Sequence, residues 1–148
     1  MELRQLQSIT GEVRCLVEVA VSEGHTNMAL FLSEYEVGEN CFSREGEALF
    51  GAYSDDRLVG IGGLNVDPYE PERSVGRLRR MYVDPSFRGQ GVGARLVERI
   101  EAQARHCFPE IQLFTTSPRA AAFYERLGYV SQHRHKVSHA KKLRADSP

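Results

Sequence analysis

The sequence lacks the features of a membrane protein and of a secreted, disulfide-rich domain. Its best apolar run, Cys15–Val21, is broken by Glu18 and falls far short of the ~18 apolar residues that a membrane span needs. The first residues include no apolar segment, so we expect no secretory leader and a cytoplasmic location, away from membranes. The three cysteines, Cys15, Cys41 and Cys107, are widely separated, which argues against a disulfide framework and a zinc knuckle. We expect no metal and three reduced thiols that are buried or half-buried.

Length and composition predict one folded domain that covers residues 1–148. A chain of 148 residues is too short for two hydrophobic cores. The hydrophobic share of 41% and the charged share of 26% are ordinary for a globular protein, which excludes a disordered chain and a fibre.

The net charge of −1 conceals a strong asymmetry along the chain. Residues 1–72 hold 14 acidic and 4 basic side chains, a balance of −10, whereas residues 73–148 hold 6 acidic and 15 basic ones, a balance of +9. Two interpretations follow: the basic half binds an anionic ligand and the acidic half a cationic one, or the two halves attract each other in the fold. We expect no nucleic-acid partner, because no basic stripe with interleaved aromatic residues occurs.

Hydrophobic periodicity predicts a mixed sheet with helices on its faces. The clearest helix is 92–106, where Val92, Leu96 and Ile100 recur at four-residue steps between charged positions. The predicted strands are 2–7, 47–53, 58–66, 75–83, 111–116, 129–133 and 137–143, and the predicted helices are 11–23, 27–36, 92–106 and 118–127. Helices inserted into a series of hairpin-linked strands favour a layered α+β architecture.

Residues 88–93, with the letters RGQGVG, lie between a predicted strand and the long helix. Glycines let backbone N–H groups approach a ligand closely, and a helix N-terminus adds partial positive charge, so this loop is suited to an anion. A Walker loop is excluded because no Gly-Lys-Ser/Thr follows. A dinucleotide fingerprint fits the letters but not the context, because residues 84–88 separate the loop from the strand and 111–116 ends without an acidic residue.

Two segments of the chain resemble motifs of the GNAT N-acetyltransferase superfamily. Residues 79–96, RRMYVDPSFRGQGVGARL, contain the R/Q-x-x-G-x-G/A core, and residues 122–130, AFYERLGYV, are similar to a second family motif at the expected distance. The resemblance implies a central mixed, mostly antiparallel sheet of six to seven strands with helices on both faces. It also implies acetyl-CoA as co-substrate.

The resemblance further implies where the coenzyme lies. Its pantetheine arm would occupy a gap between the strands 75–83 and 111–116 and pair with exposed main chain, while its pyrophosphate would lie on the glycine loop. The implied coenzyme-binding residues are Met81, Tyr82, Val83, Arg88, Gly89, Gln90, Gly91, Val92, Gly93, Ala94 and Ser117. Ser117 stands where the family often has Asn, and it either contacts the coenzyme or caps the following helix.

The implied reaction is a direct attack of a primary amine on the thioester within a ternary complex. Tyr124 matches the family's general acid, although its place in an apolar stripe is also typical of a core residue. Many family members carry a Glu at the position of Arg77, and because arginine cannot act as a base, the general base stays unassigned. A water chain and a carboxylate of the N-terminal half are both open.

Acceptors in this family meet the first helices and the loop after the third strand. Here those segments hold Glu34, Tyr35 and Tyr69, which favours a cationic small molecule or peptide, unless these residues merely form a solvated acidic face. The alternative function is a non-catalytic acetyl-CoA sensor or protein-interaction module on the same fold. By analogy with the family, a homodimer is also expected.

Overall fold

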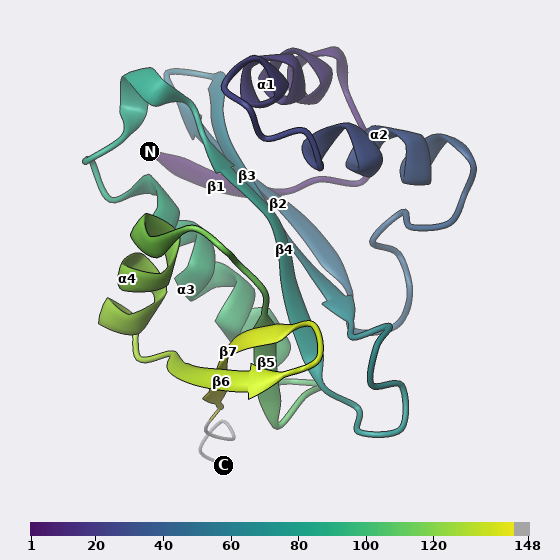
Figure 1. The fold of residues 1–148 in the computed structure, drawn as a ribbon. Helices are drawn as coiled ribbons and strands as arrows, with labels where there is room; N and C mark the ends of the chain where they lie inside the picture. Colours follow the sequence, from purple (N-terminus) through teal and green to yellow (C-terminus); the bar gives the residue numbers. More distant parts are fainter. Residues whose placement is uncertain (144–148) are drawn as a thin grey trace.

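The computed structural model describes residues 1–143, in which seven strands form one sheet (Figure 1). Along the sheet the strand order is β1-β2-β3-β4-β5-β7-β6, and every neighbouring pair is antiparallel except the parallel pair β4–β5. The strands are β1 Glu2–Gln5, β2 Ala48–Ser54, β3 Arg57–Val66, β4 Gly76–Val83, β5 Glu110–Leu113, β6 Val130–Arg134 and β7 Val137–Lys142. The helices are α1 Gly11–Ser22, α2 Met28–Glu36, α3 Val92–Ala104 and α4 Pro118–Arg126, with a 3-10 turn η1 at Pro85–Phe87. This confirms the predicted layered α+β fold.

Helices cover both faces of the sheet, and each face has its own apolar core (Figure 1). On one face, Val13 of α1 and Phe31 of α2 belong to a fully buried cluster with Ile61 of β3. On the other face, Leu96 and Ile100 of α3 form a second cluster with residues of the sheet and of α4. The four-residue apolar stripe predicted for α3 is therefore the stripe that packs on the sheet.

No helix among residues 1–143 is both long and apolar enough to cross a membrane. The expectation of buried thiols was wrong, because Cys15, Cys41 and Cys107 are free and exposed. Each of them lies on the outer side of a helix or in a connection rather than in either core.

Two features of β4 open the sheet at its middle. Its parallel partner β5 pairs only with Gly76 and Arg77, so among the described residues the rest of β4 has no strand partner on that side. In addition, Arg80 and Met81 stand together opposite the single Gly62 of β3, which is a β-bulge, and Arg80 has a positive φ of 60°. Bulges re-aim side chains, and here the Arg80 side chain reaches the α2 region, where it donates to Asn27 and Glu34.

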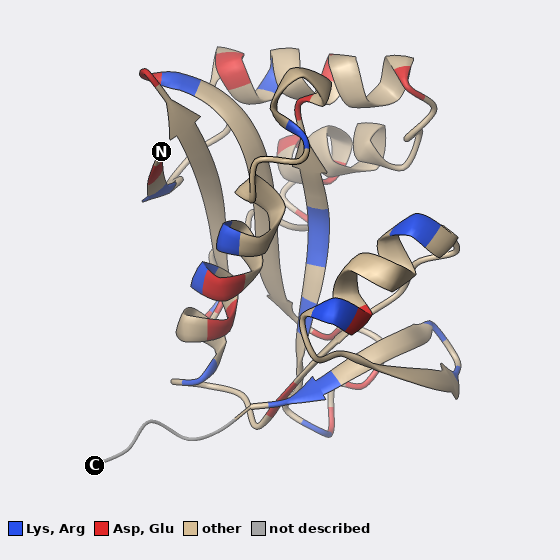
Figure 2. Ribbon diagram, turned by 90° about the vertical axis from the view of Figure 1, so that its left-hand side faces the viewer, with Lys and Arg blue, Asp and Glu red and all other residues tan. Residues whose placement is uncertain are grey.

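The two oppositely charged halves of the chain are joined by ion pairs. Arg77 pairs with Asp67, Arg80 with Glu34 and Arg88 with Glu23, each across the division at residue 72. In Figure 2, blue segments of β4 lie in the middle of the molecule, and the helices α1 and α2 carry several red segments. Attraction between the halves thus accounts for part of the charge asymmetry.

Candidate active site

A cavity of about 510 Å³ lies where β4 and β5 separate. Its walls come from β4, from the residues after β5, from α4, from the α1–α2 connection and from the β6–β7 turn. Separation of two strands leaves backbone N–H and C=O groups available to a ligand, which can pair with them as an added strand would. The cavity therefore suits an extended, partly polar ligand.

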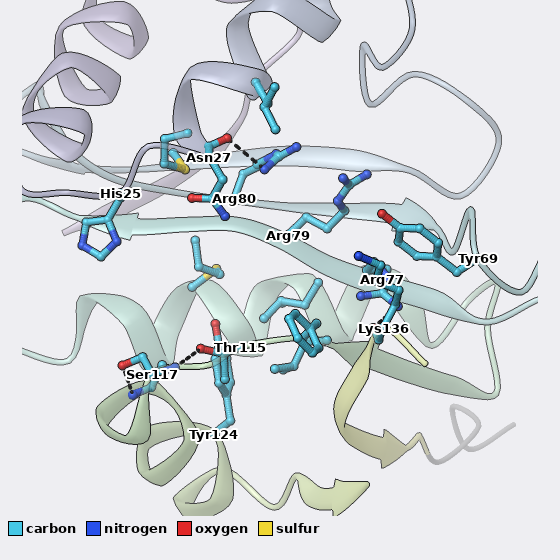
Figure 3. Close-up of a pocket in the computed structure, with 17 residues that line it drawn as sticks. His25, Asn27, Tyr69, Arg77, Arg79, Arg80, Thr115, Ser117, Tyr124 and Lys136 are labelled. Atoms are coloured by element: carbon cyan, nitrogen blue, oxygen red, sulfur yellow. Dashed lines mark hydrogen bonds between the residues drawn. The ribbon is translucent and has the colours of Figure 1, made fainter. Parts of the chain in front are cut away.

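The cavity has two distinct ends along β4 (Figure 3). At one end His25 lies near Ser117 and Tyr124, and its ring contacts Tyr82 edge-on at 5.6 Å. At the other end Tyr69 lies near Arg77 and the β6–β7 turn. Because β4 runs from the second end to the first, the glycine loop that follows β4 continues from the end with His25.

The glycine loop forms the start of α3. Gly91 is the N-cap residue with a φ of 81°, and Gly89 has a φ of 77°, a left-handed conformation that glycine adopts without a steric cost. A Cβ placed on either residue would meet no protein atom within 4 Å. The loop thus leaves open space above the first N–H groups of α3, which have no intrahelical partners. Backbone donors, a helix N-terminus and open room together fit a phosphate group.

Arg88 at the start of this loop is held by Glu23 at the end of α1. The guanidinium donates to both carboxylate oxygens, at 2.6 and 3.1 Å, and Tyr82 donates its hydroxyl to the same carboxylate. The hydrogen bonds from Arg88 and Tyr82 lower the pKa of Glu23 to about 2, while burial and the neighbouring Glu23 carboxylate raise the pKa of Tyr82 to about 12. An anion at the loop would therefore meet an arginine that already has one carboxylate partner.

Tyr124 lies on the buried side of α4 and lines the cavity. Its ring packs edge-on against Phe123 at 5.0 Å and Tyr129 at 5.6 Å, and its hydroxyl points from α4 toward β4 (Figure 3). Burial raises the pKa of Tyr124 above its ordinary value, so the phenol keeps its proton at neutral pH. Tyr124 is therefore both a packed core residue and a residue of the cavity wall.

Ser117 caps α4 at the wall of the cavity. Its hydroxyl accepts a hydrogen bond from the Ala120 backbone N–H at 3.2 Å, and its own N–H donates to the Thr115 hydroxyl at 3.1 Å (Figure 3). The N-cap predicted from the sequence is confirmed. Because Ser117 also lines the cavity, capping does not remove it from the reach of a ligand.

Arg77 is a buried cation with a carboxylate, a carbonyl and an aromatic partner. Its Nε donates to Asp67 at 2.9 Å, its Nη2 donates to the carbonyl oxygen of Lys136 at 2.7 Å, and its guanidinium lies over the Tyr69 ring at 4.9 Å. The Asp67 side chain is fully buried and also accepts from Gln112 at 2.9 Å. Arg77 thus fixes the β6–β7 turn and the Tyr69 ring at one end of the cavity.

The residues expected to bind the acceptor separate into two groups. Tyr69 lines the cavity, but Glu34 and Tyr35 do not. Glu34 is half-buried and accepts a hydrogen bond from Arg80 at 2.9 Å, so its charge is already compensated. These residues do not form an acidic site for the acceptor at this cavity, because none of the described residues that line it is acidic.

The coenzyme-binding residues expected from the sequence follow one path through the fold. Met81 and Ser117 line the cavity, and Tyr82 and Val83 complete β4 beyond Met81. The residues from Arg88 to Ala94 then form the glycine loop and the first turn of α3. Several lining residues were not predicted, namely His25, Asn27, Arg79, Arg80, Thr115 and Lys136. Two-residue alternation on β4 could have indicated Arg79, which shares a face with Arg77.

Comparisons with known proteins agree with this arrangement. The family model described as "Acetyltransferase (GNAT) domain" matches residues 45–131. Glucosamine 6-phosphate N-acetyltransferase of Trypanosoma brucei brucei is 32% identical over 82 residues, which cover 53% of this chain and 54% of that protein. The chain spans about half the length of the curated relatives that it matches.

Solved structures match over nearly the whole chain. A protein from Exiguobacterium sp. 255-15, provisionally described as an acetyltransferase, superposes with a TM-score of 0.84 at 25% identity, over 95% of this chain and 92% of that one. An aminoglycoside 6'-N-acetyltransferase in complex with coenzyme A superposes with a TM-score of 0.71 at 16% identity, over 100% of both chains. The second likeness concerns the fold alone.

Proposed function

This chain belongs to the acetyltransferase (GNAT) domain family, and on that premise we propose that it transfers the acetyl group of acetyl-CoA to a primary amine. The observation that carries the proposal is the opening between β4 and β5 beside a glycine loop that starts α3. An enzyme of this kind needs a slot for an extended thioester arm and an anion site at one end of it, and the adjacency of the opening and the loop supports this assignment.

The coenzyme is proposed to lie along β4 with its phosphates at the loop. Coenzyme A carries several negative charges on its phosphates, which suit the N–H groups from Gly89 to Ala94 and the guanidinium of Arg88. Its pantetheine arm would pair with the free main chain near Met81, Tyr82 and Val83. The arm would then bring the thioester to the middle of the cavity, where Tyr124 points toward β4.

The proposed chemistry is a direct transfer within a ternary complex. The neutral amine nitrogen gives its lone pair to the thioester carbon, a C–N bond forms, and the carbonyl oxygen becomes an oxyanion near the β4 N–H groups. The C–S bond then breaks and sulfur leaves with the electron pair. Tyr124 gives its proton to the thiolate and regains one from the nitrogen through water, so that the products are an amide and a free thiol.

Deprotonation of the amine needs no dedicated carboxylate in this cavity. Cationic side chains at its wall disfavour the ammonium form of a bound amine and so lower the pKa of that amine. The released proton is proposed to pass to water in the cavity. The cationic acceptor expected from the sequence gains no support from this lining, and the acceptor is therefore proposed as a primary amine without a net positive charge.

The alternative of a non-catalytic sensor is tested by one assay. Purified protein is mixed with acetyl-CoA and a panel of amines, and release of free thiol is followed over time. The enzyme requires thiol release that depends on both the amine and the protein. A sensor would bind acetyl-CoA, as seen by a rise in the melting temperature, and release thiol at the background rate with every amine.

The same melting experiment tests the ligand. Acetyl-CoA at ~100 times its Kd stabilises a protein by about 2.7 kcal/mol, which raises the melting temperature by several degrees at this size. NADH and ATP are the comparison ligands, because each carries phosphates but lacks the pantetheine arm. A shift with NADH or ATP and none with acetyl-CoA would overturn the proposal.

A further inference from the structure

The wall of the cavity carries positive charge that the carboxylates around it compensate only in part. Its lining includes four basic side chains and no acidic one. Arg77 is paired with Asp67, and Arg80 with Glu34. Arg79 and Lys136 have no carboxylate partner within residues 1–143. Two cations therefore remain available to a ligand.

These two cations lie at the end away from the glycine loop. Arg79 precedes Val83 by four residues, which is roughly 13 Å along an extended strand. Lys136 lies in the β6–β7 turn, and its own carbonyl oxygen accepts a hydrogen bond from Arg77. Tyr69 lies at the same end, and its ring faces Arg77 at 4.9 Å and the Lys136 ammonium at 5.9 Å (Figure 3). A coenzyme whose phosphates lie on the loop would leave this end to the acceptor.

The neighbouring Arg80 has a buried donor without a partner among the described residues, although it pairs with Glu34. Its side chain is 7% exposed, and its Nε–H is buried with no hydrogen-bond partner within the described part of the chain. Burial, followed by the adjacent Arg79 charge, lowers the pKa of Arg80 below its ordinary value. An anion at the cavity wall would reduce the repulsion between these two guanidinium groups.

We propose that the acceptor amine carries an oxyanion group, a carboxylate or a phosphate, and that Arg79 and Lys136 bind this group while Tyr69 forms the wall beside it. This inference rests on the proposed acetyl transfer and names its substrate class. Arginine presents paired donors that match carboxylate and phosphate oxygens, and lysine adds a point charge on the opposite wall. Anchored at this end, the acceptor would direct its amine along β4 toward the thioester near Tyr124.

The test uses amines that differ only in the group at the far end. O-phosphoethanolamine, β-alanine, ethanolamine and ethylenediamine offer a similar primary amine with a phosphate, a carboxylate, a hydroxyl and an ammonium group. We expect kcat/KM for thiol release to be at least about tenfold higher for the two anionic amines than for ethanolamine, and lowest for ethylenediamine. The preference should decline as ionic strength rises.

Two variants assign the preference to residues. Arg79→Gln and Lys136→Gln should each raise the KM of the anionic amines by about tenfold and leave the KM of acetyl-CoA within twofold. Arg14→Gln is the matched control, because Arg14 is paired with Glu36 on the outer helices and does not line the cavity. Equal turnover of all four amines, a preference for ethylenediamine, or unchanged selectivity in both variants would overturn the inference while the transferase function stands.

Calorimetry separates the two proposals if no amine is turned over. O-phosphoethanolamine is titrated into the protein saturated with coenzyme A. Binding that Arg79→Gln abolishes and Arg14→Gln preserves would support the anion site and reject the transferase function. Absence of binding in the wild-type protein would overturn the anion site as well.

Discussion

The guanidinium of Arg88 lies 2.6 Å from the carboxylate of Glu23, which stands 65 residues earlier in the chain. This contact ties the glycine loop to the end of α1, beside the C-terminal end of β4. It also places a carboxylate at the position where a coenzyme phosphate would approach. With the coenzyme bound as proposed, its phosphates and Glu23 would compete for the Arg88 guanidinium.

Removal of Arg88 and removal of Glu23 should change the affinity for the coenzyme in opposite directions. Arg88→Ala removes charge-assisted donors to the pyrophosphate and should raise the Kd of acetyl-CoA about tenfold or more. Glu23→Gln removes an anion that competes with the phosphates, and it should lower that Kd because Arg88 is no longer paired with a carboxylate. Isothermal titration measures both values. Weaker binding in both variants would mean that Glu23 positions Arg88 instead of competing for it.

The Glu23 carboxylate should also make stability depend on acid pH. Its pKa is depressed in the folded protein to about 2, against an ordinary 4.5, so its contribution is present above pH 4.5 and is lost as the pH falls toward 2. We expect the melting temperature of Glu23→Gln to lie below that of the wild type at pH 6 and to approach it near pH 2.

The control for this titration is Glu18→Gln on the same helix. Glu18 is exposed and has no ion pair within the described residues, so its difference from the wild type should stay near zero at every pH. If the difference in melting temperature between Glu23→Gln and the wild type is the same at pH 2 as at pH 6, the charge of the carboxylate is not the cause of that difference.

Tyr124 should be needed for turnover more than for folding. Tyr124→Phe keeps the ring contacts with Phe123 and Tyr129 and removes only the hydroxyl that points toward β4. A general acid contributes roughly 10²-fold or more to a rate, so we expect a loss of kcat of about that size with little change in the Kd of acetyl-CoA. Because burial raises the pKa of Tyr124, its ionisation should produce no descending limb below pH 10.

Tyr53→Phe provides the comparison. Tyr53 is equally buried but belongs to the cluster under α1, and it does not line the cavity. Normal kcat in both variants would reduce Tyr124 to a packing residue of the cavity wall.

The sequence predicted the elements well because their signals are local. The stripe on α3, the cap of α4 at Ser117 and the turn between β2 and β3 each depend on residues within a few positions of one another. All seven predicted strands and four helices are present within a few residues of their predicted bounds. The strand order and the bulge at Arg80 depend on contacts between distant segments, and no local pattern encodes them.

The candidate site was predicted in part for the same reason. The glycine loop and Tyr124 belong to contiguous motifs. The end of the cavity with Arg79 and Lys136, in contrast, brings together two residues that are 57 positions apart in the sequence. Glu34, the acidic residue expected to face a substrate, instead pairs with Arg80 within the protein. A one-dimensional charge pattern cannot distinguish a carboxylate that faces a ligand from one that faces an arginine.

The buried pair Arg77–Asp67 should be the costliest ion pair to break. Both side chains are almost completely buried, and Asp67 accepts from Arg77, from Gln112 and from the Tyr69 N–H. Asp67→Asn leaves the Arg77 charge buried beside a neutral amide, and loss of one partner of a buried pair costs about 3–5 kcal/mol. Unfolding in urea measures this change in the free energy of unfolding.

Two further variants separate pairing from packing at this position. Asp56→Asn removes the charge from the exposed contact with Arg4, and we expect a far smaller loss of stability than for Asp67→Asn. Arg77→Met combined with Asp67→Asn removes both charges, and we expect it to recover part of the lost stability, because the uncompensated charge is gone. The double variant should nevertheless bind the acceptor poorly, since Arg77 holds the Tyr69 ring and the Lys136 carbonyl in place. Recovered stability with unimpaired acceptor KM would show that the pair stabilises the fold without shaping the cavity.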